Sequence, residues 1–126
     1  MKNIIGIMNS IKTTDPEQVE EQLDCLLDDY AQKQAVTLLD IIDFHVRFER
    51  IQPFGDGNGR VGRMLMFKEC LKHDIMPFVI MDQDKDFYLR GLREYDRQPN
   101  YLIELCLHEQ DIYEDVCKQL LIQNES

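Results

Sequence analysis

The segment that most constrains this chain is residues 51–61, IQPFGDGNGRV, which holds three of the six glycines of the sequence within five positions. Apolar residues recur at helical spacing on both sides of it, and Pro53 ends the first helix because the residue before a proline is pushed out of helical geometry. Glycine tolerates left-handed dihedrals, so alternating glycines can turn successive backbone N–H groups toward one point. The segment therefore predicts a concave, anion-binding loop between two helices.

The helix that follows the loop adds to this prediction. It is expected to start near Asn58, so its unpaired N–H groups and the positive end of its dipole point toward the loop. Arg60 and Arg63 lie three residues apart on one helix face, where their planar guanidinium groups can clamp phosphate oxygens. Asp56 is the one carboxylate of the loop, and an acid beside bound phosphates is typical of a magnesium ligand. The pattern predicts a phosphate site with Mg²⁺.

Several common types of loop fit these residues less well. An Asn-Gly pair is frequent in two-residue hairpin turns, but the residues after Gly59 show helical rather than alternating spacing. A calcium-binding EF-hand aligned on Gly59 would need carboxylates where the chain has Phe54 and Leu65. No Gly-Lys-Ser/Thr follows, which excludes a P-loop. A plain surface loop with solvated arginines stays open, and it requires the glycines, the acid and the arginines to coincide by accident.

The charge distribution favours a small anion over a polymer. The net charge of −10 argues against a nucleic-acid backbone as the main partner, since such binding relies on lysine and arginine displacing counterions. Residues 15–30 contain seven acidic and no basic residues, whereas residues 47–72 contain six basic and three acidic ones. The glycine-rich loop thus lies in a locally positive part of an acidic chain.

Length and composition are those of one globular domain. The chain has 126 residues, and its longest wholly apolar run, residues 75–81, is seven residues long. A membrane helix needs roughly 20, so no membrane partner is expected. The four cysteines form no C-x-x-C pair, which favours reduced thiols in the cytoplasm over a zinc ribbon or a disulfide framework; they are Cys25, Cys70, Cys106 and Cys117.

Helical patterns cover most of the chain. Residues 3–12 are β-prone and predict a short strand or hairpin. A helix through Tyr30 begins at the sequence TTDPE, where either Thr14 and Glu17 form a capping box or Asp15 caps the helix with Pro16 at its first position. Further helices are expected at residues 34–51, from residue 58 to the break at 73–74, at 84–96 and at 100–122.

Residues 52–63, QPFGDGNGRVGR, resemble the signature of the Fic family, H-P-F-x-D/E-G-N-G-R-x-x-R, at eight of its nine specified positions. The segments FHVRFERI, VGRMLM, PFVI and YLRGL also resemble the family's core, so the resemblance covers roughly residues 10–122. It implies a single, mainly α domain over residues 1–126, with a short β-hairpin flap at residues 1–13 and a helical core of about five to six helices at residues 15–122.

The resemblance also implies an activity, because the family typically transfers AMP from ATP to a hydroxyl of a target protein. ATP, Mg²⁺ and a target with an acceptor Ser, Thr or Tyr hydroxyl are therefore the implied partners. By position, Asp56 would ligate Mg²⁺, Arg60 would orient the phosphates and Arg63 would reach toward the γ-phosphate. The implied nucleotide-binding residues are Phe54, Gly57, Asn58, Gly59, Arg60 and Arg63. The flap residues that would hold the target as an added strand are Ile4, Ile5, Gly6, Ile7 and Met8.

The chain departs from the signature at Gln52, where the family has the histidine that removes the proton from the attacking hydroxyl. The implied catalytic set is therefore Gln52 in place of histidine, with Asp56 and Arg60. A glutamine amide can hydrogen-bond the hydroxyl but cannot accept its proton near pH 7, and loss of such a base costs about 10² to 10⁴ in rate. His45 lies about 10 Å away along the same helix, too far to replace the base, and is expected to be a packed residue.

Three further features bear on the site and its control. The nearest match to the family's inhibitory pattern, S/T-x-x-x-E-G/N, runs from Thr13 to Glu17 and fails at Gln18, so no built-in inhibitor is expected. The helix that usually precedes the flap has no counterpart in the sequence, and a core exposed for that reason would favour a homo-oligomer. Tyr88 and Tyr95 could border the adenine, although core aromatics are the favoured interpretation.

The sequence thus favours a Fic-type protein adenylyltransferase that is impaired or inactive because of Gln52. A non-catalytic Fic-fold module that binds a partner protein is the alternative. A relative that transfers another phosphate-linked group, such as phosphate, UMP or phosphocholine, ranks below both.

Overall fold

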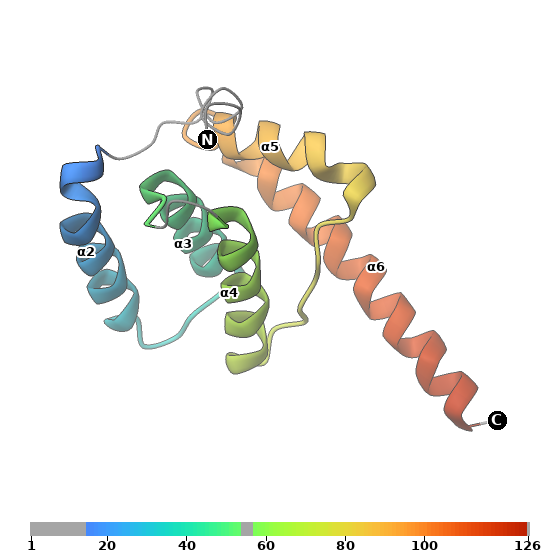
Figure 1. The fold of residues 1–126 in the computed structure, drawn as a ribbon. Coiled ribbons are helices and arrows are strands. Elements are labelled where there is room, and N and C mark those ends of the chain that lie inside the picture. The colour runs from blue at the N-terminus through green and yellow to red at the C-terminus, as the bar shows by residue number, and fades with distance from the viewer. Residues whose placement is uncertain (1–14, 54–56, 126) are drawn as a thin grey trace. The chain divides into compact units, whose positions relative to one another are not determined.

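The computed structural model describes residues 15–53 and 57–125. Over these residues the chain is mainly helical and contains no strand, which confirms the predicted fold class (Figure 1). The predicted flap, residues 1–13, lies outside the described residues. The elements in chain order are the 3₁₀-helix η1 (Pro16–Gln18), α2 (Val19–Ala31), α3 (Leu38–Ile51), α4 (Asn58–Lys72), the 3₁₀-helix η2 (Asp82–Asp84), α5 (Lys85–Glu94) and α6 (Pro99–Glu125).

The chain divides into two compact units, residues 1–66 and 67–126, with the boundary inside α4. The first unit contains α2, α3 and the start of α4, and therefore the described part of the glycine-rich motif. The second unit contains the end of α4 together with α5 and α6. No helix within the described ranges combines the length and the apolar character needed to cross a membrane.

Side-chain caps fix where the first helices begin. The Asp15 carboxylate accepts the N–H of Glu17 at 3.1 Å, with Pro16 at the first position, so the second of the two predicted caps is confirmed. Helix α3 begins at Leu38 and not at residue 34 as predicted. The reason is a capping box in which Thr37 and Asp40 each bond the other's backbone N–H, at 2.9 and 3.3 Å.

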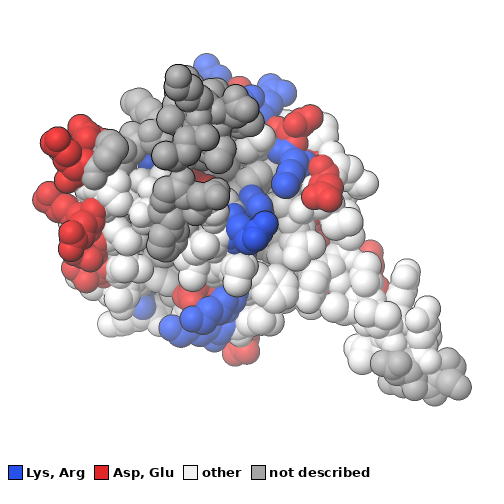
Figure 2. Space-filling model, in the orientation of Figure 1, with Lys and Arg blue, Asp and Glu red and all other residues white. Residues whose placement is uncertain are grey.

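The core of the first unit joins α2, α3 and α4. Its centre is a cluster of the buried side chains Leu26, Phe44, Phe48 and Ile51, and the partly buried residues packed against it are Val19, Leu23, Tyr30, Val61 and Leu65. Each large apolar side chain buried in this way contributes about 1.5–3 kcal/mol. Acidic side chains gather on the solvent-facing side of α2, which faces away from this apolar cluster (Figure 2). The cluster holds the end of α3 beside the start of α4, where the motif lies.

The second unit is built mainly on the packing of α5 against α6. At Gly91, a Cβ would lie 3.0 Å from the Cβ of Leu102, so a residue without a side chain is needed for this close approach. At the end of α4, Phe67 packs edge-on against Tyr113 with ring centroids 5.8 Å apart. The predicted break after α4 is confirmed, since the helix ends at Lys72 and Asp74 adopts a left-handed φ of 58°.

Candidate functional site

The motif begins where α3 ends, at Gln52. Its backbone N–H bonds the carbonyl oxygen of Phe48 at 3.2 Å, and its dihedrals, φ 50° and ψ 63°, are left-handed. A left-handed residue ends a helix and turns the chain sharply, but for a residue with a Cβ it costs about 1–2 kcal/mol. The Nε2 atom of Gln52 is buried and has no hydrogen-bond partner among the described residues. Strain of this kind at one residue is characteristic of functional sites.

The described part of the loop resumes at Gly57, which leads into α4. Gly57 has a φ of 78°, a conformation that glycine adopts without strain, and its carbonyl oxygen accepts the N–H of Val61 at 3.0 Å. Backbone N–H groups in the first turn of any α-helix lack an acceptor within the helix itself, and they share the positive end of its dipole. The start of α4 is therefore suited to an anion.

Arg63 lies over the first turn of α4. A Cβ built on Gly59 would be 3.0 Å from the Nη1 atom of Arg63, which places the guanidinium group against the glycine backbone. Arg60 is exposed on the same turn. The structure therefore brings one of the two predicted phosphate clamps, Arg63, onto the predicted anion-binding turn, and it leaves the other at the solvent-facing surface of that turn.

Several predicted site residues lie outside the described residues. These are Phe54 and Asp56 of the motif, together with the flap residues Ile4, Ile5, Gly6, Ile7 and Met8. The assignment of Mg²⁺ to Asp56 and the docking of a target on the flap accordingly stay predictions.

Beneath the motif, α3 and α4 are joined through His45. Its Nδ1 atom lies 3.1 Å from the carbonyl oxygen of Gly62, and the ring is 2% exposed. Burial lowers the pKa of His45 to about 4, with the Arg63 charge acting in the same direction and the Gly62 hydrogen bond opposing it. A neutral imidazole that donates Nδ1–H to a backbone carbonyl is a structural residue, which confirms the prediction that His45 is packed.

Glu49, one turn after His45 on α3, was not predicted as part of this region. Its side chain is 2% exposed, and its Oε1 atom is buried without a hydrogen-bond partner among the residues described. Burial raises the pKa of Glu49 to about 7, and the Arg63 charge opposes the rise. A Cβ on Gly62 would overlap Oε1 of Glu49. Spacing alone places the side chains of His45 and Glu49 on one face of α3, but the approach of Gly62 to that face is seen only in the structure.

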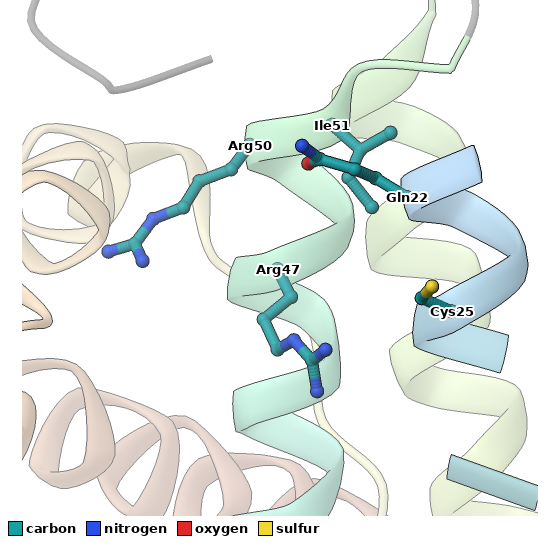
Figure 3. Close-up of a pocket in the computed structure, with 5 residues that line it drawn as sticks. All are labelled: Gln22, Cys25, Arg47, Arg50 and Ile51. Atoms are coloured by element: carbon teal, nitrogen blue, oxygen red, sulfur yellow. The ribbon is translucent and has the colours of Figure 1, made fainter. Parts of the chain in front are cut away.

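A pocket of about 230 Å³ opens between α2 and α3, and none of the described motif residues, 52–53 and 57–63, lines it (Figure 3). Its walls are Gln22 and Cys25 from α2 with Arg47, Arg50 and Ile51 from α3. Arg47 pairs with Asp29 at 3.1 Å. The volume is below the roughly 300–1,000 Å³ usual for small-molecule sites.

The tyrosines considered for adenine binding lie in the second unit. Tyr88 is 2% exposed and belongs to the core, in agreement with the favoured interpretation. Tyr95 is half-buried at the end of α5.

These observations define a class of protein: it is helical, a left-handed glycine leads into one of its helices, and an arginine side chain lies against the first turn of that helix. Residues 8–70, half of the chain, match the sequence model of the Fic/DOC family. The chain belongs to the Fic/DOC family.

Two relatives show what kind of protein this family includes. A probable protein adenylyltransferase of Aquifex aeolicus (strain VF5) is 36% identical over 63 residues, which are 50% of this chain and 19% of that protein. The protein adenylyltransferase Fic of Nematostella vectensis is 33% identical over 91 residues, which are 68% of this chain and 20% of that protein. The matched segments thus span about a fifth of the length of either relative.

Proposed function

We propose that the chain is a Fic-type protein adenylyltransferase domain that binds ATP and whose transfer step is impaired or absent, because Gln52 stands at the position of the general base. The observation that carries this proposal is the start of α4, where left-handed Gly57 leads into the helix and the Arg63 guanidinium lies over Gly59. The names of the two relatives support the reaction class.

ATP binding would rest on the first turn of α4. Its N–H groups and the positive end of the helix dipole would face the α- and β-phosphates, and Arg63 would add a charge-assisted contact to phosphate oxygens. A Cβ at Gly59 would lie 3.0 Å from Nη1 of Arg63, so the guanidinium group would have to shift if that glycine were replaced. Asp56 would hold Mg²⁺, which would neutralise phosphate charge.

AMP transfer needs a proton acceptor that this chain lacks at position 52. The target hydroxyl oxygen would attack the α-phosphorus, a phosphodiester bond would form and pyrophosphate would leave with the electrons of the broken P–O bond. The hydroxyl proton would have to pass to a base. Gln52 can orient the hydroxyl but cannot take the proton, and His45 is buried with Nδ1 directed at Gly62. Water would be the acceptor, which is slower by about 10² to 10⁴.

The test is to restore the base. Gln52→His should increase the transfer of label from ATP labelled at the α-phosphate, onto the protein itself or onto proteins of a lysate, by about 10² to 10⁴. The matched control is Gln52→Asn, which changes the side chain without adding a base and should stay at background. Adding Arg63→Ala to the histidine variant should abolish the gain. An inactive Gln52→His protein that still binds ATP would contradict the assignment of Gln52 as the missing base.

Binding is measured separately from transfer. ATP with Mg²⁺ should raise the melting temperature of the unaltered chain, and Arg63→Ala should reduce the shift. Gln52 also favours a second function, a partner-binding module in which the nucleotide turn has lost its use. If ATP raises the melting temperature of neither the unaltered chain nor Arg63→Ala, the adenylyltransferase proposal is rejected and the partner-binding module is supported.

A further inference from the structure

Three potential metal ligands meet in the second unit, and none of them belongs to the motif. Asp84 comes from η2, while His108 and Glu109 are consecutive residues of α6. One ligand atom of each residue lies within 4.8 Å of those of the other two. Neither the motif nor the proposed reaction uses any of them.

Glu109 is a buried carboxylate aimed into this group. The residue is 1% exposed, and its Oε2 atom accepts the backbone N–H of Met81 at 3.0 Å, which fixes the orientation of the carboxylate. The other oxygen, Oε1, is buried and has no hydrogen-bond partner among the described residues. Burying a carboxylate oxygen without a donor or a cation costs several kcal/mol.

Asp84 contributes a second carboxylate oxygen of the same kind. Its Oδ2 atom is also buried without a partner in the described part of the chain. The Asp84 residue itself is half-buried. Two carboxylates with buried oxygens close to each other repel unless a proton or a cation lies between them. His108 is exposed, so it offers an imidazole nitrogen at the solvent side of the pair and leaves a route by which an ion can enter.

We propose that Asp84, His108 and Glu109 bind a divalent transition-metal ion of the zinc type. Two carboxylate oxygens and one imidazole nitrogen are ligands that Zn²⁺ accepts, with a fourth position left for water. Calcium and magnesium prefer ligand sets made only of oxygen. The Met81 N–H, which bonds the Glu109 carboxylate, would orient that carboxylate toward the ion.

Such an ion would tie two parts of the second unit together. Met81 and Asp84 belong to the segment between α4 and α5, and the other two ligands lie in the middle of α6. Metal binding would therefore stabilise the attachment of this segment to α6. The proposal does not depend on ATP binding or on transfer at the motif.

A proton shared between the two carboxylates would also relieve their repulsion. Burial and the neighbouring Asp84 both raise the pKa of Glu109, and a protonated Glu109 could donate to Asp84 without any metal. The two arrangements differ in one observable, since only the metal site requires the exposed His108.

The experiment uses the full chain, freed of metal with a chelator and titrated with ZnCl₂ by calorimetry. One equivalent should bind with micromolar or tighter affinity, and the melting temperature should rise with Zn²⁺. His108→Ala should weaken binding at least tenfold and remove the thermal shift. Because His108 is exposed, this variant should fold. His73→Ala is the matched control, since His73 pairs with Glu69 outside the group, and it should bind as the unaltered chain does.

Loading the chain with Co²⁺ in place of Zn²⁺ tests whether the ion binds at the cysteines instead of at Asp84, His108 and Glu109. A thiolate-to-cobalt charge-transfer band would show sulfur ligation and would overturn the proposal, whereas its absence together with the His108 effect would support it. Failure of the unaltered chain to bind one equivalent, or equal affinity of the His108→Ala and unaltered proteins, would also overturn the proposal in favour of the shared proton.

Discussion

Replacing Glu49 by glutamine should make the fold sensitive to acid, and replacing His45 should have the opposite effect. The two side chains lie one turn apart on α3, each 2% exposed, with Arg63 as the charged neighbour of both. Burial shifts their pKa values toward each other's normal range, to about 4 for His45 and about 7 for Glu49. Between the ordinary pKa values of 4.5 for glutamate and 6.5 for histidine, the folded state therefore carries one proton on Glu49, whereas the unfolded state carries one on His45.

The magnitudes follow from linkage. The pKa of His45 is near 6.5 in the unfolded state and about 4 in the folded state, so the unfolded state binds more protons at acid pH. Lowering the pH from about 7.5 to about 4.5 therefore reduces the unfolding free energy by about 2.5 kcal/mol through His45. Glu49 titrates near 4.5 when unfolded, so the folded state binds more protons, and over the same range this adds about 3 kcal/mol. In the unaltered chain the two contributions to the unfolding free energy nearly cancel. When either residue is replaced, the pH dependence contributed by the other residue remains.

The assay is urea unfolding followed by circular dichroism at several pH values. The quantity compared is the difference in unfolding free energy between variant and unaltered protein, because other carboxylates then cancel. For Glu49→Gln this difference should become about 3 kcal/mol more destabilising from about pH 7.5 to about pH 4.5, and for His45→Asn about 2.5 kcal/mol more stabilising. Glu20→Gln on exposed α2 controls for the loss of any carboxylate. The reasoning would be refuted if the unfolding free energies of both core variants changed with pH in parallel with that of the unaltered protein.

Three further outcomes are expected. Gly62→Ala should lower the stability by about 1–3 kcal/mol, since the added Cβ would overlap Glu49 Oε1, and an unchanged melting temperature would contradict so close an approach of α3 and α4. Gln52→Gly should raise the stability by up to about 1 kcal/mol in chemical unfolding by relieving a left-handed φ of 50°, and a loss would show that the side chain supports the fold. Cys25 is exposed, whereas burial raises the pKa of Cys106 to about 12, so Cys25 should react fastest with a thiol reagent. Cys25→Ser should therefore remove the fast phase of that reaction, and a fast phase that survives would contradict this assignment.

The sequence predicted the helices well because each has an apolar face that must be buried. The starts near Asp15 and Asn58 and the break after Lys72 agree with the structure, since proline, glycine and short polar residues act locally at those points. The start of α3 was placed four residues too early. Residues 34–36 extend the pattern, but the reciprocal bonds of Thr37 with Asp40 decide where the helix begins.

Polar residues that turn inward were the ones that sequence reasoning missed. Glu49 and Glu109 are among the most buried residues of their helices, yet glutamate is usually solvated, and nothing adjacent in sequence marks them as buried. Their burial depends on contacts across 13 residues, from Glu49 to Gly62, and across 28, from Met81 to Glu109. Periodicity predicts which face of a helix is apolar, but it does not identify the partner that a buried polar side chain meets.

The motif is divided between two helices, so under the proposed function the base could be lost while the phosphate turn is kept. Position 52 ends α3, whereas the turn that would hold phosphate is local to α4, from Gly57 to Arg63. The two helices are joined beneath the motif by the apolar cluster, by the His45 bond to Gly62 and by the close approach of Gly62 to Glu49. None of these contacts involves the side chain at position 52. A change of that side chain therefore leaves the support of the turn in place, and for this reason we expect Gln52→His to restore transfer without rebuilding the nucleotide site.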